Sequence, residues 1–374
     1  MRNGNSEKNY QSLKYIMQTK FDKIDYALFS ANNTDTNQPC EISGTLERHI
    51  VPSNLTDYQV CVTSLNFPSF DIPIIKLDPF NTGWLVTMDY YYYDPATKTG
   101  TWFYYTGQVS IIPRTYRPSA QGLIYEATQV IEMVNRGMLG CMINLDDNVF
   151  AVTGQHIPGW VPGPALPFDE TKPTLHLNQT TNKISMWELP DYYQDTLMVM
   201  PDKVGGGNGG ILNVYFNRAL YLKIAGLDVY STPSEIYKFR IICHYYGDNQ
   251  NSTETALVNT QQGDYFATMS ELVSIQVITN LPIQNKYTKT GSINNVLFEL
   301  KPLELTGGFR AGVITYNVIY PFAWKDIISP AQLNDVWFKV YYIMVDGSTS
   351  IVNLPPRGSA SIDLLFQKKS TSNY

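Results

Sequence analysis

The residues of this sequence that could carry chemistry are few and far apart. A glycine-rich segment at residues 205–210, GGGNGG, has the composition of a phosphate-binding loop, but it lacks the Lys-Ser/Thr pair that such a loop requires. Residues 211–216 follow it with a strand pattern, so no helix N-terminus is expected to face an anion. We therefore interpret the segment as a flexible hairpin loop.

The four histidines, His49, His156, His176 and His244, are equally scattered. None has a second ligand type at metal-binding spacing. The adjacent pair Cys243-His244 would point to opposite faces of a strand, which prevents joint chelation. The histidine pattern therefore predicts no metal site.

Two acidic segments resemble functional motifs only superficially. Residues 247–252 lack the glycine and the closing acidic residue of an EF-hand loop. Asp146-Asp147 is interpreted as a turn rather than an acid/base pair, because neighbouring strand residues diverge. The sequence also has no Gly-x-Ser-x-Gly nucleophile motif. We predict a chain that is not an enzyme, with no catalytic, cofactor-binding or metal site and no cofactor.

Aromatic residues make up 13% of the chain, and 27 of them are tyrosines. Residues 84–93, which end in four consecutive tyrosines, and residues 102–111 are two β-prone aromatic runs. A short polar turn joins them, so together they predict a hairpin. Alternation turns half of the tyrosines at residues 90–93 into the core and leaves the other half for a subunit contact or for a ligand such as a sugar or a base.

Charge is unusually low in this chain. Charged residues make up 16% of it, against roughly 25% in typical soluble domains, although the mean hydropathy is only −0.19. A polar but weakly charged surface is poorly protected against association. We therefore expect the chain to assemble with copies of itself.

The net charge of −6 argues against a nucleic-acid binder, which would normally carry a basic footprint. The N-terminal segment differs locally, because basic residues outnumber acidic ones there. The basic residues are Arg2, Lys8, Lys14, Lys20 and Lys23. We interpret this segment as a solvated arm, with a weak contact to the genome or to neighbouring subunits as the alternative.

The four cysteines, Cys40, Cys61, Cys141 and Cys243, are widely spaced and form no CxxC pair, so no zinc site or disulfide framework is expected. No hydrophobic run approaches the roughly 18 residues of a membrane span. Residues 1–20 lack the apolar core of a signal peptide. We expect synthesis in a cytoplasm and no membrane span.

Strand patterns dominate the chain. Tyr58, Val60 and Val62 alternate with polar or smaller residues, as do Val336, Phe338 and their neighbours. Further strands are expected at residues 141–144, 149–152, 174–178, 183–187, 197–200, 211–216, 236–245, 272–279, 296–300, 313–319 and 361–366. Many strands separated by Gly, Pro and Asn turns predict a sandwich or a barrel.

Helices are expected to be rare. The best candidate covers residues 121–136, with Ser119 as its N-cap and Gly137 at its end. Residues 329–332 predict a short helical turn, and residues 10–17 carry one amphipathic stripe that would be marginal alone.

The segment at residues 51–68, VPSNLTDYQVCVTSLNFP, resembles the first jelly-roll strand of the minor capsid (penton) proteins of virophages and polinton-like elements, most of all those of the Sputnik type. Similar segments lie at residues 132–135, 183–187, 216–220, 271–278 and 353–366. The resemblance implies a single jelly roll, homopentamers at the vertices of an icosahedral virion, and double-jelly-roll major capsid proteins as neighbours. It implies no catalytic residue.

The expected fold is all-β: a single jelly-roll barrel with an inserted β-rich subdomain that carries one helix. The barrel is assigned to residues 40–120 and 250–374, the insertion to 121–249, and an N-terminal arm to 1–39. Residues 156–172, rich in proline, and the glycine-rich loop are expected at an exposed tip of the insertion. A double-jelly-roll major capsid protein and a carbohydrate- or receptor-binding β-sandwich module are the alternatives.

Overall fold

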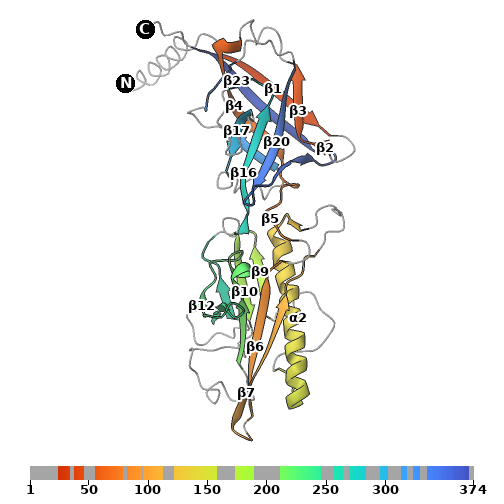
Figure 1. Cartoon of the computed structure of the whole chain (residues 1–374), viewed down its shortest axis with the longest axis vertical. Coiled ribbons are helices and arrows are strands. Elements are labelled where there is room, and N and C mark those ends of the chain that lie inside the picture. The colour runs from red at the N-terminus through yellow and green to blue at the C-terminus, as the bar shows by residue number, and fades with distance from the viewer. Residues whose placement is uncertain are drawn as a thin grey trace, which may run out of the picture. The chain divides into compact units, whose positions relative to one another are not determined.

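Strands account for most of the ordered elements in the computed structural model, so the predicted all-β class is confirmed (Figure 1). The structure describes residues 24–33, 38–45, 55–78, 82–94, 96–112, 122–157, 173–188, 211–245, 257–263, 269–283, 295–301, 313–317, 323–328 and 335–369. Two compact units share the chain. Unit 1 comprises Met1–Ile72 and Leu272–Tyr374, and unit 2 comprises Pro73–Glu271.

Unit 1 contains two antiparallel sheets built from both ends of the chain. The first has the order β1-β23-β4-β18, and the short β19 also pairs with β4. These strands are β1 (Ile24–Asn32), β23 (Ser359–Lys368), β4 (Tyr58–Pro68), β18 (Val313–Asn317) and β19 (Lys325–Asp326). The C-terminal strand β23 therefore lies between two N-terminal strands.

The second sheet has the order β17-β16-β20-β21, and β3 pairs with β20 beside β21. Its strands are β3 (Glu41–Thr45), β16 (Leu272–Thr279), β17 (Val296–Leu300), β20 (Asp335–Met344) and β21 (Thr349–Ile351). Leu55–Asp57 forms the 3-10 turn η1, and β2 (Gln38–Pro39) pairs with β22 (Asn353–Leu354).

The strand order of unit 1 interleaves the chain. Taken in chain order, the eight longer strands are β1, β3, β4, β16, β17, β18, β20 and β23. The first sheet uses the first, eighth, third and sixth, and the second uses the second, seventh, fourth and fifth. Two Greek keys folded into facing sheets produce this order. Unit 2 is inserted between the third and the fourth strand.

The core of unit 1 lies between its two sheets, and Phe29 marks the contact. Its ring lies 5.3 Å from that of Phe338 between ring centroids, which joins β1 of one sheet to β20 of the other. A Cβ at Gly44 on β3 would come within 2.6 Å of the Phe29 ring, so only glycine fits there without a shift. The predicted alternation on β20 is confirmed, since Val336, Phe338 and their even-numbered neighbours are buried.

Unit 2 contains a five-stranded sheet with the order β12-β13-β11-β6-β7 and a four-stranded sheet with the order β14-β15-β10-β9. The first comprises β6 (Leu85–Asp94), β7 (Thr99–Gln108), β11 (Ile211–Phe216), β12 (Val229–Ser231) and β13 (Phe239–Ile241). The second comprises β9 (Thr174–Asn178), β10 (Lys183–Glu188), β14 (His244–Tyr245) and β15 (Leu257–Thr260). Two short strands, β5 (Ile75–Lys76) and β8 (Leu123–Ile124), pair separately, and α3 spans Arg218–Tyr221.

The two ends of unit 2 are tied together within the unit. The backbone N–H of Glu271 donates to the carbonyl of Ile74 at 2.6 Å, and the Glu271 carboxylate accepts from the N–H of Lys76 at 3.0 Å. Lys223 forms an ion pair with the same carboxylate. These bonds close the insertion where the chain enters and leaves it.

Helix α2 (Ala127–Thr153) packs along β6 and β7 (Figure 1). The contact is close, because a Cβ at Gly107 would lie 2.7 Å from the Cys141 sulfur and one at Gly137 would lie 3.0 Å from Val109. The Asn135 side chain also donates to the Leu175 carbonyl and accepts from its N–H, which joins the helix to β9. Within the described residues, no helix has both the length and the hydropathy to cross a membrane.

The helix differs from the prediction at both ends, since it begins at Ala127 rather than at residue 121 and ends at Thr153 rather than at residue 136. It extends to Thr153 and is capped by Gly154 in the left-handed conformation, so the strands expected at residues 141–144 and 149–152 are wrong. Short apolar runs do not distinguish a strand from a buried helix. Gly137 lies inside the helix and does not end it. Its lack of a Cβ instead permits the close approach of the helix to Val109.

The expected unit boundaries also need correction. The aromatic hairpin β6–β7 was assigned to the barrel, but β6 pairs with β11 and α2 covers the hairpin, so both strands belong to unit 2. The segment from Ile24 was assigned to an arm, but it pairs along its length with β23. The single strand expected at residues 236–245 is divided between β13 and β14 of different sheets.

Several predicted features lie outside the described residues. They are the N-terminal stripe at 10–17, the N-cap at Ser119, most of the proline-rich segment 156–172, the strand at 197–200, the glycine-rich loop 205–210, the acidic segment 247–252 and the turn at 329–332.

Truncating Phe29 tests the contact between the sheets of unit 1. We expect Phe29→Ala to lower the free energy of unfolding by about 3–5 kcal/mol, because it removes a buried ring from a packed core. Leu28→Ala is the matched control, since Leu28 is its neighbour on β1 and is 70% exposed; a change within about 0.5 kcal/mol is expected. If chemical denaturation showed equal losses of unfolding free energy for the two variants, Phe29 would not be on the buried face of β1.

Candidate functional site on unit 2

The two faces of the β6–β7 hairpin differ in what covers them. Val86, Met88 and Tyr90 alternate onto the face that α2 covers, together with Gly107 of β7. The intervening residues therefore face away from the helix. This second face carries a mixture of aromatic and polar side chains, and it is the candidate site.

Exposed aromatic rings border this second face. Trp102 is 52% exposed and Tyr104 is 66% exposed, both on β7. The Trp102 ring packs against Tyr91 of β6, with 4.8 Å between ring centroids and a tilt of 60°. Tyr215 and Tyr237 meet edge to face at 5.2 Å on the far side. Partner rings thus hold Trp102 and Tyr237 in place.

A polar network forms the floor between these rings. Asn213 of β11 lies opposite Asp89 of β6, and its side-chain amide donates to the Asp89 carboxylate at 2.6 Å. The Arg240 guanidinium of β13 donates to the side-chain Oδ1 of Asn213 at 3.5 Å. The Tyr215 hydroxyl is a second hydrogen-bond partner of Asp89. Three strands therefore supply a carboxylate, an amide, a guanidinium and a phenol to one small area.

Burial controls the ionisation of this floor. Desolvation raises the pKa of the Asp89 carboxyl above its ordinary value, and hydrogen bonds from Asn213 and Tyr215 together with the charge of Arg240 oppose that rise. Desolvation, with the neighbouring Asp89 charge, also raises the pKa of the Tyr215 hydroxyl. Tyr215 is therefore a neutral donor at neutral pH.

These residues line an open groove of about 330 Å³. Its lining consists of Asp89, Trp102, Phe103, Tyr104, Tyr215, Thr232, Ser234 and Tyr237. The volume is at the lower end of the range for pockets that bind small molecules. The segment between β12 and β13 supplies Thr232, Ser234 and Tyr237 and so forms one wall. We refer to these eight residues as the aromatic groove.

The sequence predicted only part of this groove. The hairpin and the outward aromatic residues were expected, but Tyr90–Tyr93 was thought to supply them, whereas the most exposed rings are those of Trp102 and Tyr104. Asp89, Asn213 and Tyr215 were not predicted as neighbours, because the pairing of β6 with β11 joins residues more than 120 positions apart. An acidic residue inside an aromatic strand was the one local indication.

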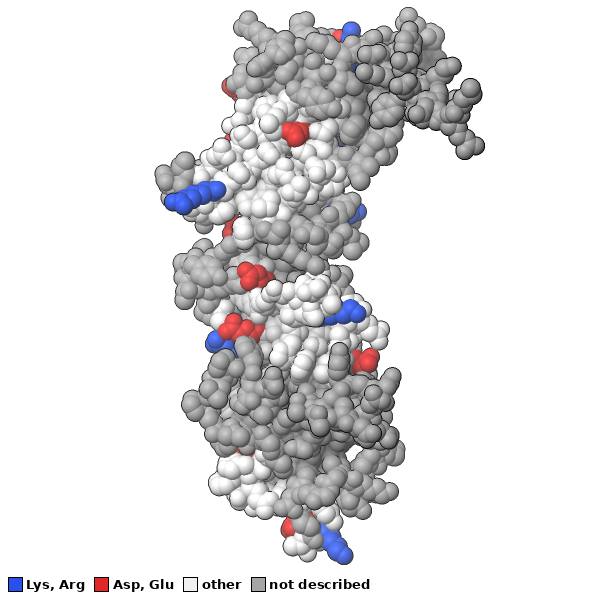
Figure 2. Space-filling model, turned by 180° about the vertical axis from the view of Figure 1, so that it is seen from behind, with Lys and Arg blue, Asp and Glu red and all other residues white. Residues whose placement is uncertain are grey.

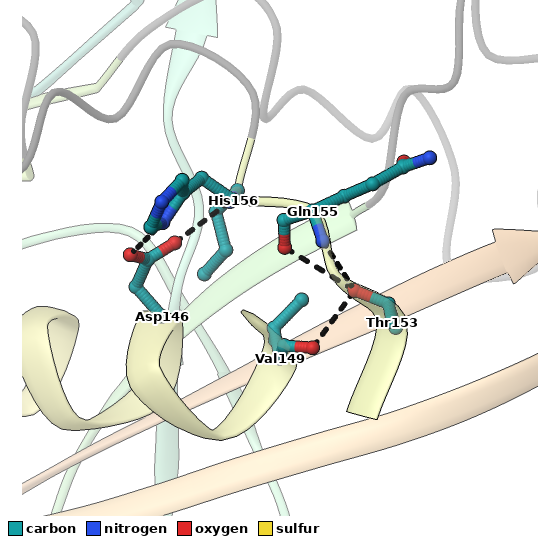
Figure 3. A network of polar contacts seen from close by, with 6 residues as sticks. Asp146, Val149, Thr153, Gln155 and His156 are labelled. Atoms are coloured by element: carbon teal, nitrogen blue, oxygen red, sulfur yellow. Dashed lines mark hydrogen bonds and ion pairs between the residues drawn. The ribbon is translucent and has the colours of Figure 1, made fainter. Parts of the chain in front are cut away.

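Asp146 and His156, which the sequence offered as candidate chemical groups, form contacts that stabilise the fold. Asp146 lies inside α2 rather than in a turn, and its carboxylate accepts from the N–H of Ile157 at 2.8 Å and contacts the His156 ring nitrogen at 2.7 Å (Figure 3). Thr153 donates to the Val149 carbonyl in the same network. This network attaches the chain that follows α2 to the helix.

The remaining titratable groups are dispersed. His176 bonds to the Thr174 hydroxyl at 2.9 Å and packs beside Trp187, while His49 lies outside the described residues. The four cysteines are buried and form no disulfide. Burial raises the pKa of Cys40, Cys61 and Cys141 to about 12, so these thiols are protonated at neutral pH. Over the described ranges, no three His, Cys, Asp or Glu side chains are grouped as metal ligands would be.

Charge is sparse on the surface as well as in the composition. On the face shown in Figure 2, charged side chains of the described residues are scattered among uncharged ones and form no continuous basic or acidic area. Such a surface suits contacts with other protein copies better than contacts with a polyanion.

Comparison with known proteins places this fold in a family. The sequence profile of the Sputnik minor capsid protein V18/19 family matches residues 51–368. A chain from the cryo-EM structure of the Sputnik virophage has a TM-score of 0.65 at 19% identity, covering 94% of this chain and 99% of that chain. The crystal structure of the mavirus penton protein has a TM-score of 0.57 at 13% identity, covering 93% and 100%. No curated protein matches the chain.

The family defines a structural protein of viral capsids. The chain belongs to the Sputnik minor capsid protein V18/19 family, because the match covers most of its length. The resemblance seen in the sequence is thereby confirmed, and a non-catalytic role agrees with it. Neither the major capsid protein nor the carbohydrate-binding module is favoured as the identity of the chain.

The Asp89 carboxyl gives unit 2 a pH dependence of known sign. Because its folded-state pKa is raised, Asp89 favours folding at low pH and loses that contribution as the pH rises through the folded pKa. We expect the wild type to lose stability relative to Asp89→Asn as the pH rises above about 3.9, the ordinary pKa of an aspartate. Denaturation curves at several pH values measure the difference.

Asp94 on the same strand provides the control with the opposite sign. Hydrogen bonds from the Thr97 side chain and the Ala96 N–H lower the pKa of its carboxyl, so its contribution is lost as the pH falls. Asp94→Asn should therefore weaken the protein at neutral pH relative to acid pH. If the unfolding free energies of the wild type, Asp89→Asn and Asp94→Asn changed with pH in the same way, the opposite pKa shifts assigned to Asp89 and Asp94 would be disproved.

Proposed function

We propose that this minor capsid protein forms homopentamers at the vertices of an icosahedral virion. The family match over residues 51–368 is the observation that carries the proposal. Two further features support it. The strand order of unit 1 agrees with a single jelly roll, and the fold is shared with a protein described as the mavirus penton protein.

Ring formation places a requirement on the surface of the chain. Five copies around an axis use heterologous contacts, in which two different faces of each copy meet. Such faces are depleted in charge relative to the rest of a protein surface. The low charged fraction of 16% supports lateral faces of this kind.

The neighbours of the pentamer follow from the same proposal. A vertex protein meets the major capsid protein on its outer rim, and we propose the double-jelly-roll type as that partner. Synthesis is proposed in the host cytoplasm, where buried free thiols such as Cys40 stay reduced. The protein then functions in the virion.

Purified protein at micromolar concentration should sediment with five times the monomer mass of 42.4 kDa, or should reach that state when the major capsid protein is added. Mass photometry and negative-stain images of the same sample measure the copy number and the symmetry. Protein that stays monomeric and never enters particles with the major capsid protein would refute the proposal.

We also propose that the basic N-terminal residues anchor the protein on the inner side of the shell. Deletion of residues 1–23 should leave unit 1 folded, since β1 begins at Ile24 and pairs with Gln367, but should reduce incorporation into particles. A full-length variant with Lys8, Lys14 and Lys20 changed to Gln removes positive charge without shortening the chain. It therefore shows whether incorporation depends on the charge or on the length of the N-terminal segment. Normal incorporation of both variants would show that the residues are a solvated tail.

A further inference from the structure

The aromatic groove has exposed hydrogen-bonding groups that the fold itself does not use. No residue that the structure describes accepts a hydrogen bond from the indole N–H of Trp102 or pairs with the hydroxyl of Tyr104. Two polar groups that the fold uses only in part also line the groove: the Ser234 hydroxyl, which accepts from the Tyr237 N–H at 3.2 Å, and the Asp89 carboxylate, which accepts from Asn213. A folded protein gains little from exposing a tryptophan in the same groove as a partly buried carboxylate, so this combination indicates a ligand.

The rings of the groove are arranged before any ligand arrives. Tyr91 supports the Trp102 ring at 4.8 Å, and Tyr215 supports Tyr237 at 5.2 Å. Because the supporting residues belong to the paired strands β6 and β11, these rings lose little freedom on binding. An aromatic face is electron-rich, so it attracts the polarised C–H groups on one side of a sugar ring.

The floor of the groove suits hydroxyl groups. A carboxylate has about four acceptor positions, and Asn213 and Tyr215 are the partners described for Asp89. A ligand hydroxyl that reaches Asp89 could therefore donate to the carboxylate without displacing either residue. On the opposite wall the Thr232 hydroxyl donates to the Tyr237 carbonyl, so it can accept from a ligand, and the Ser234 hydroxyl accepts from the Tyr237 N–H, so it can donate to one.

The local charge balance selects a neutral ligand. Arg240 and Asp89 give the floor one basic and one acidic group, and the charge of Arg240 opposes the rise in the pKa of Asp89. A cationic ligand would compete with Arg240, and an anionic one would approach the Asp89 carboxylate. The floor carries one acidic and one basic group and can accept hydrogen bonds from hydroxyl groups. Together with the apolar ring faces, it suits a pyranose that carries no charge.

We propose that the aromatic groove of unit 2 binds a neutral glycan through one or two pyranose units, with Trp102 and Tyr104 as the stacking platform and Asp89 as the hydroxyl acceptor. This activity is additional to the capsid role and does not depend on pentamer formation. It differs from a lectin identity for the chain, because unit 1 keeps its place in the capsid family.

An array of neutral and acidic glycans, probed with the full-length purified protein, tests the proposal. We expect binding to at least one neutral glycan, followed by titration calorimetry with that compound. Trp102→Ala and Asp89→Asn should each weaken binding at least about tenfold. Phe150→Ala is the control, because Phe150 is also exposed but lies on α2, which covers the opposite face of the sheet.

Each other outcome overturns the proposal. No neutral glycan bound, or selective binding of acidic glycans, would exclude the ligand class. Neutral glycan binding that Trp102→Ala leaves unchanged would exclude the groove. If Trp102→Ala instead abolishes binding of the major capsid protein while no glycan binds, the groove is a protein contact. Circular dichroism of each variant verifies folding, and pentamer formation is measured in the same samples so that the two proposals fail separately.

Discussion

The fold of unit 1 depends on the pairing of β23 between β1 and β4. Its register with β1 runs from Ile24↔Gln367 to Asn32↔Ser359, and on its other side it pairs with β4 from Tyr58 onward. Without β23, strand β1 would no longer be paired with the rest of the first sheet. The apolar side chains between the two sheets would then be open to water. The pairing joins residues more than 290 positions apart, so it is formed at a high entropic cost of loop closure.

The insertion reduces that cost by being closed at its own base. The bonds between Ile74, Lys76 and Glu271 bring the two ends of unit 2 together. Once they form, the 199-residue insertion (271 − 72) acts as a short connection between β4 and β16. The separation in sequence between β23 and its partners β1 and β4 is then shortened by those 199 residues.

Local patterns predicted the elements well, but not how the elements meet. Strands such as β11 and β16 were expected at their observed bounds, because alternation is a property of consecutive residues. The second half of α2 was missed because its short apolar runs fit a strand as well as a buried helix. The floor of the aromatic groove was beyond prediction, since the register of β6 with β11 places Asp89 beside Asn213. The same pairing explains why the hairpin was assigned to the wrong unit.

Placing unit 2 between β4 and β16 has a consequence for synthesis on the ribosome. The ribosome completes all residues of unit 2 while 97 residues (368 − 271) up to the end of β23 are still to be translated. At typical elongation rates this interval lasts roughly 5–20 s. Throughout it, β1 and β4 have been made but lack β23, the strand that lies between them, and their apolar faces are open to solvent. A nascent chain of this design therefore has a fully synthesised insertion attached to a unit 1 that still lacks its last strands, and this is the stage at which a chaperone would bind.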